Sequence, residues 1–139
     1  CIGETLEERE SGMVHQVLSR QLDAIFGDLS KMQAEKIILA YEPRWAIGTD
    51  RLPSTQEIYQ VRVMLRKWLL DRLGEATEES IAGVYGGSVK AGFLGAVSWE
   101  AEMDGVLVGR ESLFPFEVVK MMLLLEEARG QDNSITETE

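Results

Sequence analysis

Apolar residues recur at helical spacing in four stretches of the chain. Over residues 13–29 they fall at intervals of three and four, which is typical of an amphipathic helix. A second helix is predicted over residues 54–73, because this stretch opens with an S-x-x-E capping box and is followed by a glycine. A third helix is predicted over residues 114–129. The pattern over residues 91–99 is weaker, since two glycines lower its helix propensity.

Short continuous apolar runs alternate with these helices, at residues 36–41, 81–85 and 105–109. Runs without strict polar alternation are expected of parallel strands that are covered on both faces. The first residues, Cys1 to Glu4, look like the end of one more strand. Repeated strand–helix units with right-handed crossovers form a parallel sheet, which is either open and doubly wound or closed into a barrel. The periodicity leaves both architectures open.

Composition narrows the class of protein. The chain has 139 residues, of which 45% are hydrophobic, and this fits one domain at residues 1–130 with an acidic tail, 131–139, predicted to be frayed. A balance of 14 Lys and Arg against 24 Asp and Glu, with a net charge of -10, argues against binding nucleic acid or an anionic membrane through bulk charge. The longest apolar stretch, 121–125, is too short to span a bilayer, and there is no signal-peptide pattern. A single cysteine, Cys1, agrees with a reducing compartment, so we expect a cytoplasmic protein.

Three predicted strands end in polar or glycine-rich segments. These are Glu42, the Gly-Gly-Ser run 86–88 and the Gly-Arg pair 109–110. In parallel α/β folds the ligand site lies beyond the carboxyl ends of the strands, so these segments are expected to meet at one mouth. A carboxylate at the rim of an apolar strand is costly to desolvate and is therefore either solvated or used in chemistry. Backbone N–H groups in glycine-lined loops can hold a phosphate without a basic side chain.

Each of these features also has a simpler interpretation. A glycine pair after a strand is most often a turn. Glu42 could equally pair with an arginine such as Arg44 or Arg51. The Glu-Glu-Arg-Glu run at 7–10 is most simply a solvated, charged start of a helix, and His15 is most simply a surface residue. The residues alone leave these alternatives open.

Four stretches taken together resemble the triosephosphate isomerase family. CIGETLEERESG (1–12) is similar to that family's segment at the end of strand five, and YEPRWAIGT (41–49) to its strand six and mobile lid. YGGSV (85–89) is similar to its strand seven and DGVLVG (104–109) to its strand eight. The resemblance covers nearly the whole chain apart from the acidic tail. It implies an α/β fold, the TIM (β/α)8 barrel, of which this chain would be the C-terminal half only.

The resemblance also implies an activity. Members of the family interconvert dihydroxyacetone phosphate and glyceraldehyde 3-phosphate without a metal or an organic cofactor, as cytoplasmic homodimers. Glu42 would be the general base that takes a proton from the carbon next to the substrate carbonyl. Residues 43–53 would form a lid, with hinges at 43–45 and 51–53, that excludes water from the reaction.

The remaining roles implied by the resemblance concern phosphate binding and the lid. Tyr85 and Ser88 would latch the closed lid, whereas Glu4 would hold Trp45 when the lid is open. The phosphate and substrate set is Gly48, Ser88, Gly109 and Arg110, and the lid and latch set is Pro43, Arg44, Trp45, Ala46, Ile47, Thr49, Tyr85 and Glu4.

The chain departs from the family pattern at three positions. Arg110 follows Gly109 where a second glycine is usual, so the arginine side chain competes with the backbone N–H groups as the ligand of a phosphate. Asp50 replaces a glycine after the lid threonine, and Phe93 stands where an asparagine is common. These departures affect the lid and the phosphate site more than the family resemblance.

A larger difference is length. A full barrel takes roughly 250 residues, and the family's asparagine and lysine from strand one and its histidine electrophile from strand four have no counterpart here. We therefore expect a fragment, and we expect this chain alone to be inactive because the substrate carbonyl is not polarised. The alternative is a non-catalytic half-barrel that binds phosphate or self-associates through unpaired strand edges.

Overall fold

The computed structural model describes residues 1–133, apart from the side chains of residues 98–99 and 128–133. Helices and short turns alternate with three strands in this part of the chain. In chain order the elements are α1 (Leu6–Glu10), α2 (Val14–Phe26), α3 (Lys31–Ala34), β1 (Ile38–Tyr41), η1 (Arg44–Ala46), α4 (Thr55–Leu73), α5 (Glu75–Ser80), β2 (Ala82–Tyr85), η2 (Ala91–Phe93), η3 (Ala96–Glu100), β3 (Gly105–Val106), η4 (Arg110–Leu113) and α6 (Pro115–Asn133). Within residues 1–133, every helix is too short or too polar to cross a membrane.

The three strands form one parallel sheet in the order β1-β2-β3. Tyr41 lies beside Tyr85 in the register of β1 and β2, and Tyr85 lies beside Val106 in that of β2 and β3. Ile2 extends the sheet beyond β1 through a parallel bridge to Tyr41. Because all these segments run in the same direction, their carboxyl ends lie at one edge. The predicted parallel α/β arrangement is confirmed, and it agrees with part of a barrel.

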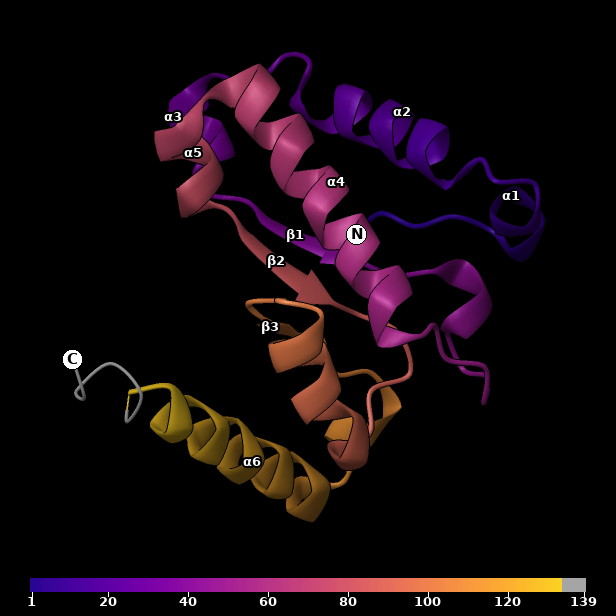
Figure 1. Ribbon diagram of the computed structural model, residues 1–139, viewed down its shortest axis with the longest axis vertical. Coiled ribbons are helices and arrows are strands. Elements are labelled where there is room, and N and C mark those ends of the chain that lie inside the picture. Colours follow the sequence, from indigo (N-terminus) through magenta and orange to yellow (C-terminus); the bar gives the residue numbers. More distant parts are fainter. Residues whose placement is uncertain (134–139) are drawn as a thin grey trace.

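Helices α2 and α4 lie together beside β1 and β2, whereas α6 lies at the other end of the molecule, beyond β3 (Figure 1). The core joins the apolar stripes of α2 and α4, such as Leu18 and Leu65, to Leu39 and Tyr41 of β1. Successive side chains of a strand point to opposite faces. Ile38 therefore points away from this core and is 68% exposed.

The second predicted helix has the ends that its sequence indicates. Ser54 and Glu57 form the capping box at the start of α4, with each side chain accepting a hydrogen bond from the other's backbone N–H. The helix ends at Gly74, whose φ of 89° is a left-handed value that glycine adopts readily.

Other boundaries differ from the prediction. The strand predicted over 105–109 is shorter, since the paired residues are Gly105–Val106, although the Leu107 N–H still donates to the Tyr85 carbonyl at 2.8 Å. The helix predicted over 91–99 is confirmed in an irregular form, because residues 91–100 are helical without a break but pass from the 3-10 turn η2 into the π-helical η3. Helix α6 includes residues 131–133, and the rest of the tail predicted over 131–139 lies outside the described residues, so its fraying stays a prediction.

Candidate active site

A cavity of about 480 Å³ opens at the carboxyl edge of the sheet. The three polar or glycine-rich strand ends at 42, 86–88 and 109–110 all contribute to it, together with part of the segment 43–53. The lining residues are Glu42, Ile47, Gly48, Thr49, Asp50, Gly86, Gly87, Ser88, Val89, Lys90, Leu107, Gly109, Arg110 and Glu111. The convergence expected from the sequence is therefore present.

Glu42 lies in this cavity, half-buried, and its backbone is fixed by the sheet. Its N–H donates to the Ile2 carbonyl at 2.7 Å. Gly86 makes room for its side chain, because a Cβ at position 86 would lie 2.7 Å from Glu42 Oε1. Among residues 1–133 the Glu42 carboxylate forms no ion pair, so the pairing with Arg44 or Arg51 that the sequence allowed is not observed. A half-buried, unpaired carboxylate at a cavity can accept a proton from a bound molecule.

Gly3 explains how closely the first residues approach the backbone of Glu42. A Cβ at position 3 would overlap the carbonyl oxygen of Glu42. Gly3 is held in place on its other side by Gln21 of α2, whose side-chain amide accepts from its N–H at 2.9 Å and donates to its carbonyl at 3.0 Å. The backbone at the base of the segment 43–53 therefore packs directly on the backbone of residue 3.

The glycine-rich loops present backbone donors to the cavity. Gly48 has a φ of 67°, a left-handed value that disfavours other residues. The N–H groups of Ser88 and Gly109 have no hydrogen-bond acceptor within the described chain. Such unpaired N–H groups at a cavity suit an anionic ligand.

Two basic side chains also line the cavity. Lys90 pairs with Asp50 at 3.7 Å across the cavity mouth, and both side chains are exposed. The Arg110 guanidinium reaches toward Gly48, with Nη2 3.9 Å from the position a Cβ would occupy there. Arg110 has no ion pair with a residue in 1–133, so it can contribute charge to the same site. Within that part of the chain, no group of three or more His, Cys, Asp or Glu side chains could hold a metal ion.

The predicted lid contacts the rest of the molecule on two sides. On one side, Trp45 Nε1 donates to Glu4 Oε1 at 2.9 Å. On the other, the Ser88 hydroxyl lies 2.7 Å from the Ala46 carbonyl and 3.1 Å from that of Thr49. The segment therefore contacts both Glu4 and Ser88 in the same structure.

The other predicted lid residues occupy different environments. Pro43 is buried and precedes η1, and the exposed Arg44 donates its backbone N–H to the Glu4 carbonyl at 2.9 Å. Tyr85 is fully buried and does not line the cavity. Its latching role stays a prediction, as do the roles of the other site residues.

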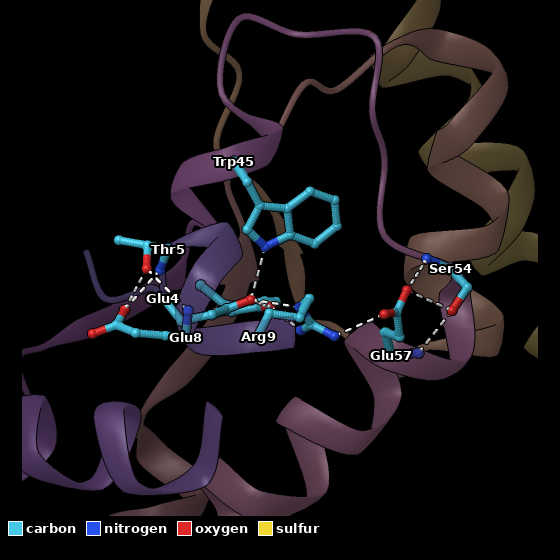
Figure 2. Close-up of polar contacts among 8 residues, drawn as sticks. Glu4, Thr5, Glu8, Arg9, Trp45, Ser54 and Glu57 are labelled. Carbon is cyan, nitrogen blue, oxygen red and sulfur yellow. Dashed lines mark hydrogen bonds and ion pairs between the residues drawn. The ribbon is translucent and has the colours of Figure 1, made fainter. Parts of the chain in front are cut away.

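Arg9 lies at the centre of a polar cluster that we did not predict from the sequence (Figure 2). Its side chain is 16% exposed and its Nε lies 2.7 Å from Oε1 of the fully buried Glu4. The interpretation of residues 7–10 as a solvated helix start is therefore wrong for Arg9. Glu57, 48 residues further along the chain, lies 2.7 Å from Arg9 Nη1. One sequence signal for this cluster was the capping box of α4. Its glutamate, Glu57, uses Oε2 for the cap and leaves Oε1 to bind a cation such as Arg9.

The cluster and its neighbours have shifted acidities. Burial is the main cause that raises the pKa of Tyr41 and of Tyr85, and the Glu4 carboxylate raises both further, so both hydroxyls stay protonated at neutral pH. Burial alone would raise the pKa of Glu57. Its hydrogen bonds from Ser54 and the nearby Arg9 outweigh that effect and hold the pKa below its ordinary value.

Comparison with known proteins gives one consistent result. The sequence model of the triosephosphate isomerase family matches residues 1–125. The triosephosphate isomerase of Emericella nidulans is 45% identical over 115 residues, which are 83% of this chain and 46% of the relative. That of Ruegeria pomeroyi is 39% identical over 130 residues, 94% of this chain and 51% of the relative. The chain thus spans about half the length of the curated relatives it matches.

Proposed function

Because the chain belongs to the triosephosphate isomerase family, we propose that it supplies the base, the lid and the phosphate loops of a triosephosphate isomerase. The observation that carries the proposal is the unpaired Glu42 carboxylate facing glycine-lined loops across one cavity. The substrates would be dihydroxyacetone phosphate and glyceraldehyde 3-phosphate. Glu42 would remove a proton from the carbon beside the carbonyl and return it to the neighbouring carbon, so that no cofactor is consumed.

The proposed phosphate site uses backbone donors from three loops. The N–H groups of Gly48, Ser88 and Gly109 would hold the phosphate, with the Arg110 guanidinium beside them. This local arrangement would let a chain with a net charge of -10 bind an anion. Closure of the segment 43–53 would exclude water and place the apolar Ile47 over the reacting carbons.

The proposal also requires a group that polarises the carbonyl. Lys90 and Arg110 are the basic side chains at the cavity within residues 1–133, and His15 is exposed on α2 and does not line it. We propose that the electrophile comes from the half of the relatives that this chain does not match. On this proposal the complete enzyme is a cytoplasmic homodimer, residues 1–130 form a part of its barrel, and the 139-residue chain alone is inactive.

The test joins the unmatched N-terminal part of the Emericella nidulans relative to this chain and measures isomerisation of glyceraldehyde 3-phosphate. Glu42→Gln should lower kcat by at least about 1,000-fold, ~4 kcal/mol in barrier. Glu111→Gln is the matched control, because Glu111 also lines the cavity. A loss of less than about tenfold for Glu42→Gln would remove the base assignment. The chain by itself should show no activity in the same assay.

The two candidate phosphate ligands are separated by binding inorganic phosphate to the 139-residue chain. Amide chemical shifts should change at Gly48, Ser88 and Gly109, and Arg110→Gly should weaken binding by less than about tenfold. A greater loss without shifts at these amides would make the arginine side chain the main ligand.

A non-catalytic, self-associating half-barrel is the second candidate. Exposed apolar side chains support it, namely Ile38 on β1, Leu107 directly after β3 and the 90% exposed Phe116 on α6. Light scattering of the 139-residue chain at micromolar concentration should then detect a defined oligomer. A compact monomer that unfolds cooperatively would contradict this candidate.

A further inference from the structure

Arg9 contacts structures at both ends of the segment 43–53, although it lies more than thirty residues before it in the chain (Figure 2). The two ends are the predicted hinges, 43–45 and 51–53. At the first hinge Trp45 binds the Glu4 carboxylate. Directly after the second hinge, Ser54 binds the Glu57 carboxylate. Arg9 binds both carboxylates.

The first end is fixed through Glu4. Glu4 Oε1 accepts from Trp45 Nε1 at 2.9 Å, from Arg9 Nε at 2.7 Å and from the Tyr41 hydroxyl at 3.1 Å. The Arg9 guanidinium also lies over the Trp45 ring, 5.3 Å from its centroid, at a distance suited to a cation–π contact. Arg9 therefore touches Trp45 directly and also through Glu4.

The second end is fixed through Glu57. Its Oε1 lies 2.7 Å from Arg9 Nη1, and its Oε2 accepts from the backbone N–H and the hydroxyl of Ser54 at 2.8 and 2.9 Å. Ser54 directly follows the hinge residue Pro53, which is buried. One carboxylate thus joins Arg9 to Ser54, the residue that follows the lid.

Only an arginine can make this set of contacts. Its Nε, Nη1 and Nη2 donate to Glu4, Glu57 and the Tyr41 hydroxyl, respectively. Guanidinium donors point in fixed, divergent directions within one plane, whereas a lysine ammonium is a single point of charge. A lysine at position 9 keeps the charge but cannot bridge both carboxylates with the same geometry.

We propose that Arg9 is a positioning residue that couples the two hinges, so that release of Trp45 from Glu4 also loosens the Ser54 end. A change that weakens the contacts at one hinge then shifts the equilibrium between the fixed and the released state of the other hinge, as linkage requires. This inference rests on the proposed function in one respect, namely that residues 43–53 act as a lid. It adds that the lid opens and closes at both ends together.

The experiment measures hydrogen exchange by NMR in the 139-residue chain. The reporters are the Trp45 indole N–H for the first end and the amide of Ser54 for the second, each normalised to the sheet amide of Val84 as a measure of global opening. Glu57→Gln is the decisive variant, because Glu57 contacts Arg9 and Ser54 but neither Glu4 nor Trp45. It should speed exchange of the Trp45 indole by about threefold or more. An unchanged indole would overturn the coupling.

Arg9→Lys gives the second arm. It should speed exchange at both reporters, and in its presence Glu57→Gln should have no further effect on the indole, which is the non-additivity expected of a shared contact. Wild-type exchange at both ends in Arg9→Lys would overturn the inference. Arg20→Gln is the matched control, because Arg20 is a nearby cation that pairs at 3.9 Å with Glu8 and touches neither hinge.

A second variant is available if Glu57→Gln destabilises the whole chain. If Glu57→Gln also raises exchange of Val84, Ser54→Ala replaces it, because that variant removes the two hydroxyl contacts between Ser54 and Glu57 but keeps both carboxylates of the cluster. Activity is not a readout here. Loss of the base assignment for Glu42 would leave the exchange result unaffected, and failure of the coupling would leave the isomerase assay unaffected.

Discussion

Glu4 and Glu42 follow neighbouring strand segments, yet their surroundings are opposite. Glu4 is fully buried beneath α1 and accepts hydrogen bonds from Arg9, Tyr41 and Trp45 on one oxygen. Glu42 faces the cavity, where Gly86 leaves space for its side chain. The comparison shows that the number of donors around a carboxylate separates a group that holds structure from one that is available to react.

The largest expected effect concerns stability on the Glu4 side. Arg9→Ala leaves a buried carboxylate without its cation and should lower the free energy of unfolding by about 3–5 kcal/mol. Glu42→Gln should change it by less than about 0.5 kcal/mol, because no described contact is lost. Urea denaturation of the 139-residue chain measures both. Equal effects of the two substitutions would contradict the contrast between the carboxylates.

A methyl group at Gly86 tests the cavity side. Gly86→Ala places its Cβ against the Glu42 carboxylate and should lower kcat of the joined enzyme by about 100-fold through misplacement of the base. Gly92→Ala is the matched control, since nothing lies within 4 Å of a Cβ there. Full activity in Gly86→Ala would mean that Glu42 does not need this position.

Acid should weaken the Glu57 contacts in a definite direction. The folded-state pKa of Glu57 lies below its ordinary value of 4.5. Its stabilisation is therefore fully present above that value and is lost as the pH falls through the lower folded pKa. Wild type should exceed Glu57→Gln in unfolding free energy by about 1 kcal/mol at neutral pH, and the two should converge in acid. Denaturation curves between neutral pH and pH 3 would show a constant difference if Glu57 were not involved.

The smallest effect is expected at the exposed pair of Lys90 and Asp50. Solvent and salt screen such a pair, so Lys90→Gln should leave urea denaturation unchanged within error. Phosphate affinity should change by less than about twofold in the same variant. A larger change would place Lys90 among the phosphate ligands.

Local patterns in the sequence predicted the parts of the structure that local chemistry determines. The capping box at Ser54, the end of α4 at Gly74 and the convergence of strand ends near Glu42 all follow from short motifs. The length of strand β3 was overestimated, because an apolar run does not show how far the neighbouring strand continues to pair with it. The two glycines of 91–99 indicated a weak helix, and the helix that forms there is irregular, with 3-10 geometry at its start and π geometry at its end.

The polar cluster could not be derived in this way. Arg9 meets Glu57 across 48 residues of sequence, and nothing in the run at 7–10 distinguishes a buried arginine from a solvated one. Charged side chains pair across a fold according to tertiary geometry, which single-sequence periodicity does not contain. The contacts of Arg9 therefore depend on the tertiary positions of both carboxylates.

Gly3 has a consequence for how this sequence tolerates change. A side chain at position 3 would meet the Glu42 carbonyl, and backbone cannot rotate away as a side chain does. In a library that samples every amino acid at each position, folded variants should retain glycine at position 3 even when Glu42 itself is replaced. By contrast, Gly86 meets the Glu42 side chain, so alanine at position 86 should become acceptable once residue 42 is shortened. One glycine is then fixed by the path of the chain, and the other is fixed only by its neighbour's identity.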